Sequence, residues 1–219
     1  MKQVFKTFKM FFFVIMIGLF FTTCDDVVYS GAGGNNFVYL GNTLTLSGQV
    51  YHEYTYQPFT GNLSIFCEYG GQGQIINGVL NYSIGVPTNL DPIYYYFNGE
   101  ANDDFLIITP SRNVNVVILE GLTDYYYYKL AKVRNTESTE EELVHIYVDN
   151  DVTLNVVGYT DNFFYEGIYW TYIGYDNTLP LKKGWNALYL KREIFGTSTH
   201  KTAIFSLELK NPSIPWIIW

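Results

Sequence analysis

The pattern of apolar and polar positions changes at about residue 37. Beyond that point the chain consists of short runs in which apolar and polar residues alternate, rich in Val, Ile, Thr and aromatics and ended by Gly, Asn, Asp or Pro. Alternation with a period of two is typical of strands, and no later window repeats with the 3.6-residue period of a helix. We therefore expect strands at Thr43–Val50, Asn62–Tyr69, Gly78–Gly85, Phe105–Thr109, Val114–Leu119, Tyr126–Val133, Leu143–Val148, Val152–Gly158, Ile168–Ile173, Ala187–Arg192, Ala203–Leu209 and Ile214–Trp219.

Turn residues separate these runs. Asp149–Asp151 lies between two alternating segments and predicts a tight hairpin, and Asn77-Gly78 predicts a second turn. Lys182-Lys183-Gly184 predicts a turn in which Gly184 has a positive φ. The acidic stretch Thr136–Glu142 is interpreted as a solvated loop.

Many short strands at this spacing indicate a sandwich or a barrel, and the chain is long enough for one large or two modest domains. We expect an all-β fold, an antiparallel β-sandwich of two modules at residues 37–120 and 121–219 with the boundary near Gly121. The segment Phe59–Gly85 resembles in a general way the opening hairpins of immunoglobulin-like or transthyretin-like modules, although the Cys–Trp–Cys spacing of immunoglobulin domains is missing. Little helix is expected after the first two dozen residues.

Those first residues have a different pattern. Lys2, Lys6 and Lys9 precede an apolar run of 12 residues from Met10 to Phe21. A helix of that length is roughly 18 Å long, short of the ~30 Å hydrocarbon core of a membrane. The basic start, short apolar core and small polar residues that follow predict a signal peptide over residues 1–23.

The next residues carry a resemblance to a family. Phe21-Thr22-Thr23-Cys24 resembles the lipobox of bacterial lipoproteins, in the relaxed form found in spirochaetes and some Bacteroidota. The resemblance implies cleavage between Thr23 and Cys24, and a lipid anchor (a diacylglyceryl group, usually with a third acyl chain such as palmitate) on Cys24. The family prefers Leu where Phe21 stands and Gly, Ala or Ser where Thr23 stands. Residues 24–36, rich in Gly and Asn, are then a flexible tether.

Charge and location follow from this interpretation. Loss of the three leader lysines changes the net charge from −8 to −11, and so acidic a protein is not expected to bind nucleic acid or to dock electrostatically on anionic lipid. Membrane attachment would come from the lipid anchor. We expect a place in the bacterial cell envelope, at the outer membrane or cell surface rather than the inner membrane, although Asp25 would favour inner-membrane retention under enterobacterial sorting rules.

Candidate chemistry is sparse. If Cys24 is lipidated, Cys67 has no disulfide partner and is expected to be a small core residue on the face of Leu63 and Ile65; a Cys24–Cys67 disulfide is the alternative. His145 alternates with apolar neighbours and is interpreted as a strand residue rather than a ligand. The sequence contains no recognised nucleophile, zinc or phosphate-binding motif, so we expect no enzyme activity, no metal and no cofactor.

Aromatic residues are the unusual feature of the body, with 21 Tyr, 16 Phe and 4 Trp. Tyr125–Tyr128 run consecutively, so two of them must face away from a core. A candidate glycan- or protein-binding surface combines exposed aromatics with polar groups, in which Trp170 and Tyr172 share one face and Tyr169 and Tyr175 the other. Its residues are Tyr169, Trp170, Tyr172, Tyr175 and Asp176.

These observations favour a lipid-anchored protein that presents a non-catalytic β body for binding or adhesion. The alternatives are a structural or assembly protein of the envelope without a dedicated ligand, a small outer-membrane β-barrel, and a glycan-active enzyme with an unrecognised carboxylate pair.

Overall fold

The computed structural model describes residues 39–67, 69–100, 106–124 and 129–219. The expected signal peptide, Cys24, the tether at residues 24–36 and Tyr125–Tyr128 lie outside the described residues. Within them the chain is all-β, as predicted. Its elements are β1 (Tyr39–Gly41), β2 (Leu44–His52), β3 (Leu63–Phe66), β4 (Gln72–Ile76), β5 (Val79–Ile84), β6 (Asp91–Pro92), the 3₁₀ turn η1 (Ile93–Tyr95), β7 (Leu106–Pro110), β8 (Asn115–Leu119), β9 (Leu122–Asp124), β10 (Lys129–Asn135), β11 (Thr139–Val148), β12 (Val152–Gly158), β13 (Thr160–Tyr165), β14 (Ile168–Gly174), β15 (Asn177–Leu181), β16 (Gly184–Gly196), β17 (His200–Leu209) and β18 (Trp216–Ile218).

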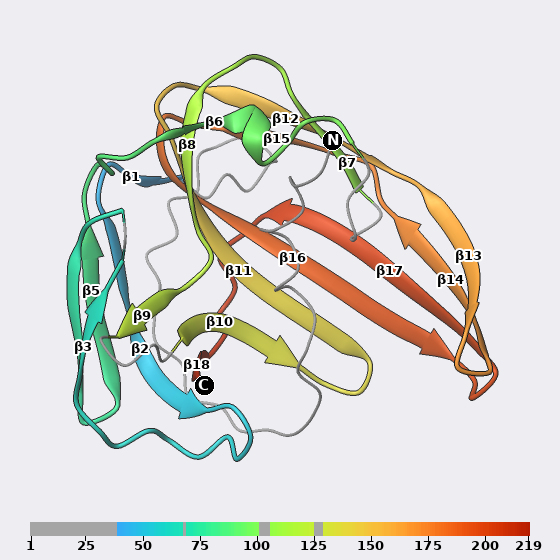
Figure 1. Cartoon of the computed structure of the whole chain (residues 1–219), viewed down its shortest axis with the longest axis horizontal. Coiled ribbons are helices and arrows are strands. Elements are labelled where there is room, and N and C mark those ends of the chain that lie inside the picture. The colour runs from blue at the N-terminus through green and yellow to red at the C-terminus, as the bar shows by residue number, and fades with distance from the viewer. Residues whose placement is uncertain (1–38, 68, 101–105, 125–128) are drawn as a thin grey trace, which may run out of the picture.

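Seven strands close a barrel in the order β10-β18-β2-β5-β4-β3-β9, with β9 pairing back onto β10 (Figure 1). Alternate residues of these strands point inward, as the sequence pattern requires. Apolar side chains fill the interior: Leu44, Leu46, Val50, Ile65, Ile75, Leu80, Tyr82, Ile84, Leu122, Leu130, Trp216 and Ile218, together with Val117, Leu119, Tyr147 and Trp185 from β8, β11 and β16.

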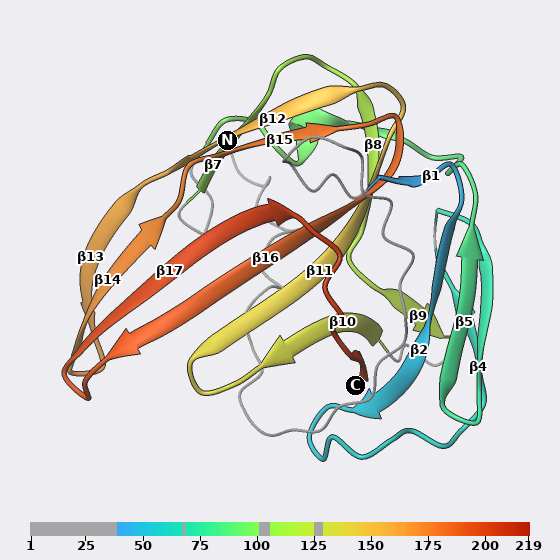
Figure 2. The ribbon, with the colours of Figure 1, turned by 180° about the vertical axis from the view of Figure 1, so that it is seen from behind.

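The sheet continues past the barrel through β11, β16, β17, β14 and β13, so long strands project to one side in both views (Figures 1 and 2). This is one closed and extended sheet where the sequence predicted an antiparallel sandwich. Two of its pairings are parallel, β18 with β2 and β14 with β17. The two expected modules do not form separate pairing units either, because β9, β10 and β18 close the barrel with β2 to β5.

A second core lies between the extended sheet and a three-stranded sheet of order β15-β12-β7. Figure 2 shows this small sheet crossing above the long strands. The apolar faces of β7, β12 and β15 pack against β8, β11, β16 and β17, with η1 at the side. The buried members are Ile93, Phe97, Leu106, Ile108, Val114, Val116, Val144, Ile146, Val148, Val152, Leu154, Val156, Leu179, Leu181, Leu188 and Leu207.

Strand β11 belongs to both cores. One of its edges pairs with β16 along its whole length, and the other pairs with β8 toward Val148 and with β10 toward the start of the strand. Every residue from Leu143 to Val148 is buried. Val144 and Ile146 face the second core, whereas Tyr147 faces the barrel. The continuous apolar run in the sequence is therefore the run of a strand covered on both faces.

One long hairpin changes sheets half-way along. Strands β12 and β15 pair in the small sheet, and their continuations β13 and β14 pair in the extended sheet. At the change, Gly158 lies so close to Gly174 that a Cβ on Gly158 would stand 1.9 Å from the Gly174 carbonyl oxygen. Only glycine permits this approach of two backbones.

The predicted turns have mixed outcomes. Asn77 and Gly78 both have positive φ and join β4 to β5, as expected. The turn at Asp149–Asp151 is tight but is not a hairpin, because it leads from β11 in the extended sheet to β12 in the small one. The prediction of a solvated loop at Thr136–Glu142 is also wrong. The second half of this stretch lies in β11, where Glu140 pairs with Arg192 and Glu141 with Arg134.

His145 is an ionisable side chain inside the doubly covered run, where only 3% of it is exposed. Burial lowers the pKa of His145 to about 3, and the positive charge of Lys132 acts in the same direction. The imidazole is neutral in the native protein under ordinary conditions, and its place in a strand is as the sequence pattern predicted. The half-buried Cys67 likewise packs against the barrel core, beside Tyr82.

The lowered pKa of His145 predicts how stability depends on pH. An unfolded histidine binds its proton near pH 6.5, whereas native His145 stays neutral down to about pH 3, so the unfolded state binds the extra proton between these values. The free energy of unfolding should therefore decrease as the pH is lowered through this window. His145 should contribute about 1.4 kcal/mol per pH unit to this decrease. Urea denaturation of wild type and His145→Gln at several pH values measures the difference in slope.

The matched control is His200→Gln, which changes a histidine that is exposed on β17. It makes the same substitution without removing a buried ring, so it separates the loss of a histidine from the loss of the buried imidazole. Equal slopes for wild type and His145→Gln would contradict a buried neutral imidazole.

Candidate functional site

The β13–β14 hairpin forms the outer edge of the projecting sheet and contains three of the residues singled out in the sequence. Antiparallel pairing sets Phe163 opposite Trp170 and Phe164 opposite Tyr169. Directly opposed residues share a face of a sheet. Phe163 and Trp170 therefore lie on one face, called here the core face because it continues onto the second core. Phe164 and Tyr169 lie on the other, called the groove face.

On the core face, aromatic rings and cations alternate. The Tyr172 ring meets Phe163 edge-on at 4.7 Å and Trp170 at 5.6 Å between centroids. The Nζ of Lys201 lies 5.2 Å from the centre of the Trp170 ring, and the Arg192 guanidinium lies 5.7 Å from that of Tyr172. These contacts fall in the range of cation–π attraction. The expectation that Trp170 and Tyr172 share a face is confirmed.

Arg192 anchors this face. Besides Tyr172 it covers Phe205, with the guanidinium carbon 5.5 Å from the ring centre, and its Nη1 lies 2.8 Å from the Glu140 carboxylate. Only 12% of the Arg192 side chain is exposed. Burial also raises the pKa of the Tyr172 hydroxyl. The rings of the core face are thus engaged by the protein's own side chains, which leaves little free ring surface for a ligand.

The groove face is more open. Phe164 and Tyr169 are 61% and 58% exposed, and their ring centroids lie 4.7 Å apart. His200 of β17 stacks on Tyr169 with a centroid distance of 5.2 Å and an interplanar angle of 21°. Next along the hairpin, Thr171 donates its hydroxyl hydrogen to Oδ1 of Asn162 at 2.8 Å. Flat rings and amide and hydroxyl groups therefore lie side by side.

A shallow groove of about 290 Å³ runs along this part of the hairpin. Strand β13 ends the strand order, and its outer edge has no paired strand among the described residues. The groove therefore opens at a sheet edge that still has unpaired backbone groups to offer. Its lining consists of Asn162, Phe163, Phe164, Tyr169, Trp170 and Thr171.

The residues expected to form one surface are thus divided. Tyr169 lies on the groove face, whereas Trp170 and Tyr172 lie on the core face, and Trp170 also lines the groove at the edge of the hairpin. Tyr175 is exposed beyond the end of β14, and Asp176 accepts a hydrogen bond from the Gly158 backbone N–H at 2.9 Å. Asp176 therefore stabilises the change of sheets rather than the groove.

The sequence did not indicate Asn162, Phe164, His200 or Arg192 as partners in this region. A signal for the first two exists in the printed sequence. Glu166-Gly167 separates two aromatic runs and is a two-residue turn with positive φ at both positions. This turn predicts that Phe164 and Tyr169 are opposed.

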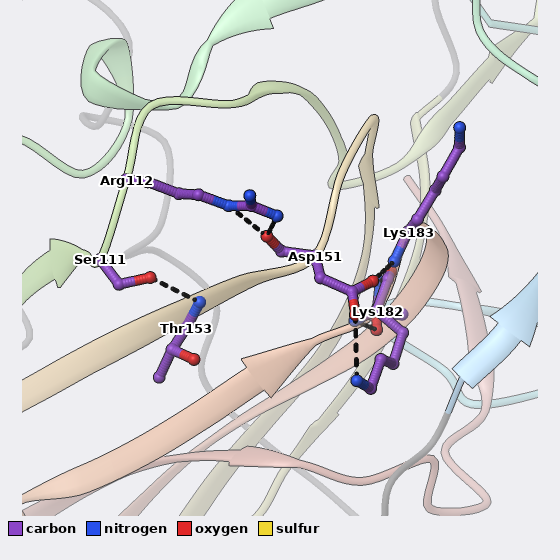
Figure 3. Close-up of polar contacts among 7 residues, drawn as sticks. Ser111, Arg112, Asp151, Thr153, Lys182 and Lys183 are labelled. Atoms are coloured by element: carbon purple, nitrogen blue, oxygen red, sulfur yellow. Dashed lines mark hydrogen bonds and ion pairs between the residues drawn. The ribbon is translucent and has the colours of Figure 1, made fainter.

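A second polar cluster lies where three connections pass between the two sheets (Figure 3). The Asp151 carboxylate accepts the Lys183 backbone N–H at 2.8 Å and pairs with the Lys182 ammonium at 3.0 Å. The side chain of Arg112 donates to the Asp151 carbonyl oxygen. The backbone hydrogen bond from Lys183, followed by Lys182, lowers the pKa of the Asp151 carboxyl. Gly184, which follows, has the predicted positive φ.

Neighbouring contacts complete the same corner. Thr153 donates its backbone N–H to the Ser111 hydroxyl oxygen at 3.0 Å, and the Asp149 carboxylate accepts both the backbone N–H and the side-chain amide of Asn115. The acidic side chains of this turn are therefore occupied in joining the β7–β8, β11–β12 and β15–β16 connections. In the described part of the chain no three His, Cys, Asp or Glu side chains cluster as a metal site would require.

No helix among the described residues is both long and apolar enough to span a bilayer. No protein-family model, curated protein or solved structure matches the chain.

The corner contacts predict a specific order of stabilities. Asp151→Ala removes an acceptor for the Lys183 N–H and should lower the free energy of unfolding by about 1 kcal/mol. Lys182→Met removes only an exposed ion pair and should cost less than about 0.5 kcal/mol. Thermal and urea denaturation of both variants measures this order.

The difference between wild type and Asp151→Ala should also depend on pH. Because the native pKa is lowered, the carboxylate's contribution is present above the ordinary aspartate pKa of about 3.9 and disappears as the pH falls through the native value. A difference that persists in strong acid, or a larger effect of Lys182→Met, would show that the charge is not what holds this corner.

Proposed function

We propose that this chain is a lipoprotein of the bacterial cell envelope, anchored through Cys24, and that its β body binds a glycan at the groove of the β13–β14 hairpin. The anchor rests on the sequence: a basic start, a short apolar core and Phe21-Thr22-Thr23-Cys24 before an acidic, Gly-rich tether. Two or three acyl chains hold a protein on a membrane stably, which one chain does not.

The binding role is supported above all by the exposed ring pair Phe164 and Tyr169. Large apolar side chains that stay exposed side by side are typical of an interaction site. Sugar rings present C–H groups that match the negative face of an aromatic ring. The amide of Asn162 and the hydroxyl of Thr171 line the same groove, and both groups can donate hydrogen bonds to sugar hydroxyls and accept them. We propose outer-membrane or surface display, which would leave the groove accessible.

A non-catalytic role agrees with the polar groups at the groove. Asn162 and Thr171 supply an amide and a hydroxyl, and none of the described residues that line it is acidic. Glycoside hydrolysis by the usual mechanism needs two carboxylates roughly 5–9.5 Å apart across the substrate. We also propose that the β-sandwich expected from the sequence corresponds to the two-layer region, where the small sheet packs on the long strands.

The anchor is tested by metabolic labelling. Cells that express the full-length chain and grow with labelled palmitate should incorporate label into the wild-type protein and none into Cys24→Ser, because the thioether needs the sulfur of Cys24. The matched control is Cys67→Ser, which should keep the label. Unlabelled wild-type protein, or label that survives Cys24→Ser, would refute the anchor.

The groove is tested with full-length protein in non-ionic detergent on an array of neutral and acidic oligosaccharides. For any glycan bound, Tyr169→Ala and Phe164→Ala should each weaken affinity about three- to tenfold, through loss of a ring contact. Tyr175→Ala is the matched control, since Tyr175 is similarly exposed at 52% but lies outside the groove. Absence of any bound glycan, or equal losses in all three variants, would contradict a glycan site here.

A further inference from the structure

A second pocket, of about 400 Å³, lies at the rim of the barrel where β2 and β18 end beside each other. Figure 1 shows the two strands ending on the same side of the barrel. Mouths of barrels are common places for small ligands, and this volume lies within their usual range of about 300–1,000 Å³. The lining residues are His52, Glu53, Tyr54, Thr55, Phe59, Ile218 and Trp219.

The backbone fixes the position of Glu53. Its N–H donates to the Ile218 carbonyl oxygen at 3.2 Å, which ties the first residue after β2 to β18. The chain then reverses: Tyr56, with a φ of +50°, donates its N–H to the His52 carbonyl oxygen at 2.9 Å. Phe59 returns to pair with Val50. The backbone of Glu53 is thus held beside the pocket by a hydrogen bond that does not involve its carboxylate.

One oxygen of the Glu53 carboxylate has no hydrogen-bond partner among the described residues. The residue is only 6% exposed, and its Oε1 is buried without a hydrogen-bond donor. Burying a charged oxygen without a donor is costly, usually by several kcal/mol. The terminal torsion of a glutamate is soft, so this oxygen can turn toward the pocket at little cost. An unsatisfied acceptor in the wall of a pocket indicates a ligand that supplies the donor.

The other walls are aromatic. The rings of His52 and Phe59 meet edge-on with centroids 5.3 Å apart. Trp219 is 38% exposed, and the Nζ of Lys129 lies 6.0 Å from its ring centre, so this indole already has a cation at one face. The described side chains that line the pocket include one carboxyl group, that of Glu53, and no Lys or Arg.

We propose that this pocket binds a small molecule through a protonated amine, with the ammonium N–H groups donating to Glu53 and the attached carbon skeleton packed on Phe59 and Trp219. A cation satisfies the charge and the missing donor at once, and aromatic walls attract it further. A neutral sugar would leave the buried charge uncompensated. The site is separate from the hairpin groove and does not depend on the glycan proposal.

The probe pair is benzylamine, protonated at neutral pH, and benzyl alcohol, its neutral analogue of the same shape. Saturation-transfer NMR and calorimetry with the full-length protein should show saturable binding of benzylamine, at least about tenfold tighter than benzyl alcohol. Glu53→Gln should weaken benzylamine binding at least about tenfold, while Glu137→Gln, an exposed acid on the β10–β11 turn, should leave it unchanged.

Stability gives an independent readout. Glu53→Gln should melt no lower than wild type without ligand, because it removes an uncompensated buried charge. Trp219→Leu is the second variant and should weaken benzylamine binding several-fold by loss of the ring. The proposal is overturned if benzylamine does not bind, if benzyl alcohol binds equally well, or if Glu53→Gln binds benzylamine as wild type does.

Discussion

Burial of β11 and β16 on both faces is the constraint on which the rest of the structure depends. Each strand offers one face to the barrel side and the other to the second core, so a side chain that fails to pack on either side would weaken both. A fully buried aliphatic side chain contributes roughly 1.5–3 kcal/mol through the hydrophobic effect. Polar residues are tolerated there only when satisfied. Asn186 is an example. Its side-chain oxygen accepts the Lys182 backbone N–H, and its side-chain NH₂ group donates to the carbonyl oxygens of Lys182 and Gly184.

The same two strands are longer than the cores that cover them. Beyond Tyr189 and Leu143 the residues of β16 and β11 are half buried or exposed, and charged side chains become frequent. Arg192 and Glu140 compensate each other there, and the Arg192 guanidinium covers Tyr172 and Phe205. At the projecting end, packed aromatic and cationic side chains thus cover the sheet, as a second layer of strands does nearer the barrel. The groove face, which has no such cover, remains exposed.

Sequence reasoning succeeded where one local pattern decides the outcome. The strict alternation of Val152–Gly158 and the turn at Asn77-Gly78 needed nothing from the rest of the chain. It failed where a distant partner decides. Thr139–Glu142 is acidic enough for a loop, yet it is a strand because Arg134 and Arg192 are placed opposite. A tight turn such as Asp149–Asp151 has the same composition whether its strands pair or pass to different sheets, so the passage from β11 to the small sheet was not foreseen.

The candidate sites show the same division. The sequence singles out Tyr169 and Trp170 because they belong to one aromatic-rich strand. His200 lies beside Tyr169 through a parallel strand pairing that no local pattern predicts. Glu53 gave no signal at all, since its surroundings combine residues 52–59 with residues 218–219.

The filled interior of the barrel explains where small-molecule space remains. Trp216, the first residue of β18, donates its indole N–H to the Ser47 carbonyl oxygen at 3.2 Å and lies against Gly48, where a Cβ would lie 3.2 Å from the ring. Lys132 covers the same indole. Apolar side chains fill the interior, and the pocket lies at the rim, where Ile218, the last residue of β18, is one of its lining residues. Glu53 is buried at this rim, and its Oε1 has no hydrogen-bond donor among the described residues, so the barrel core itself does not supply one.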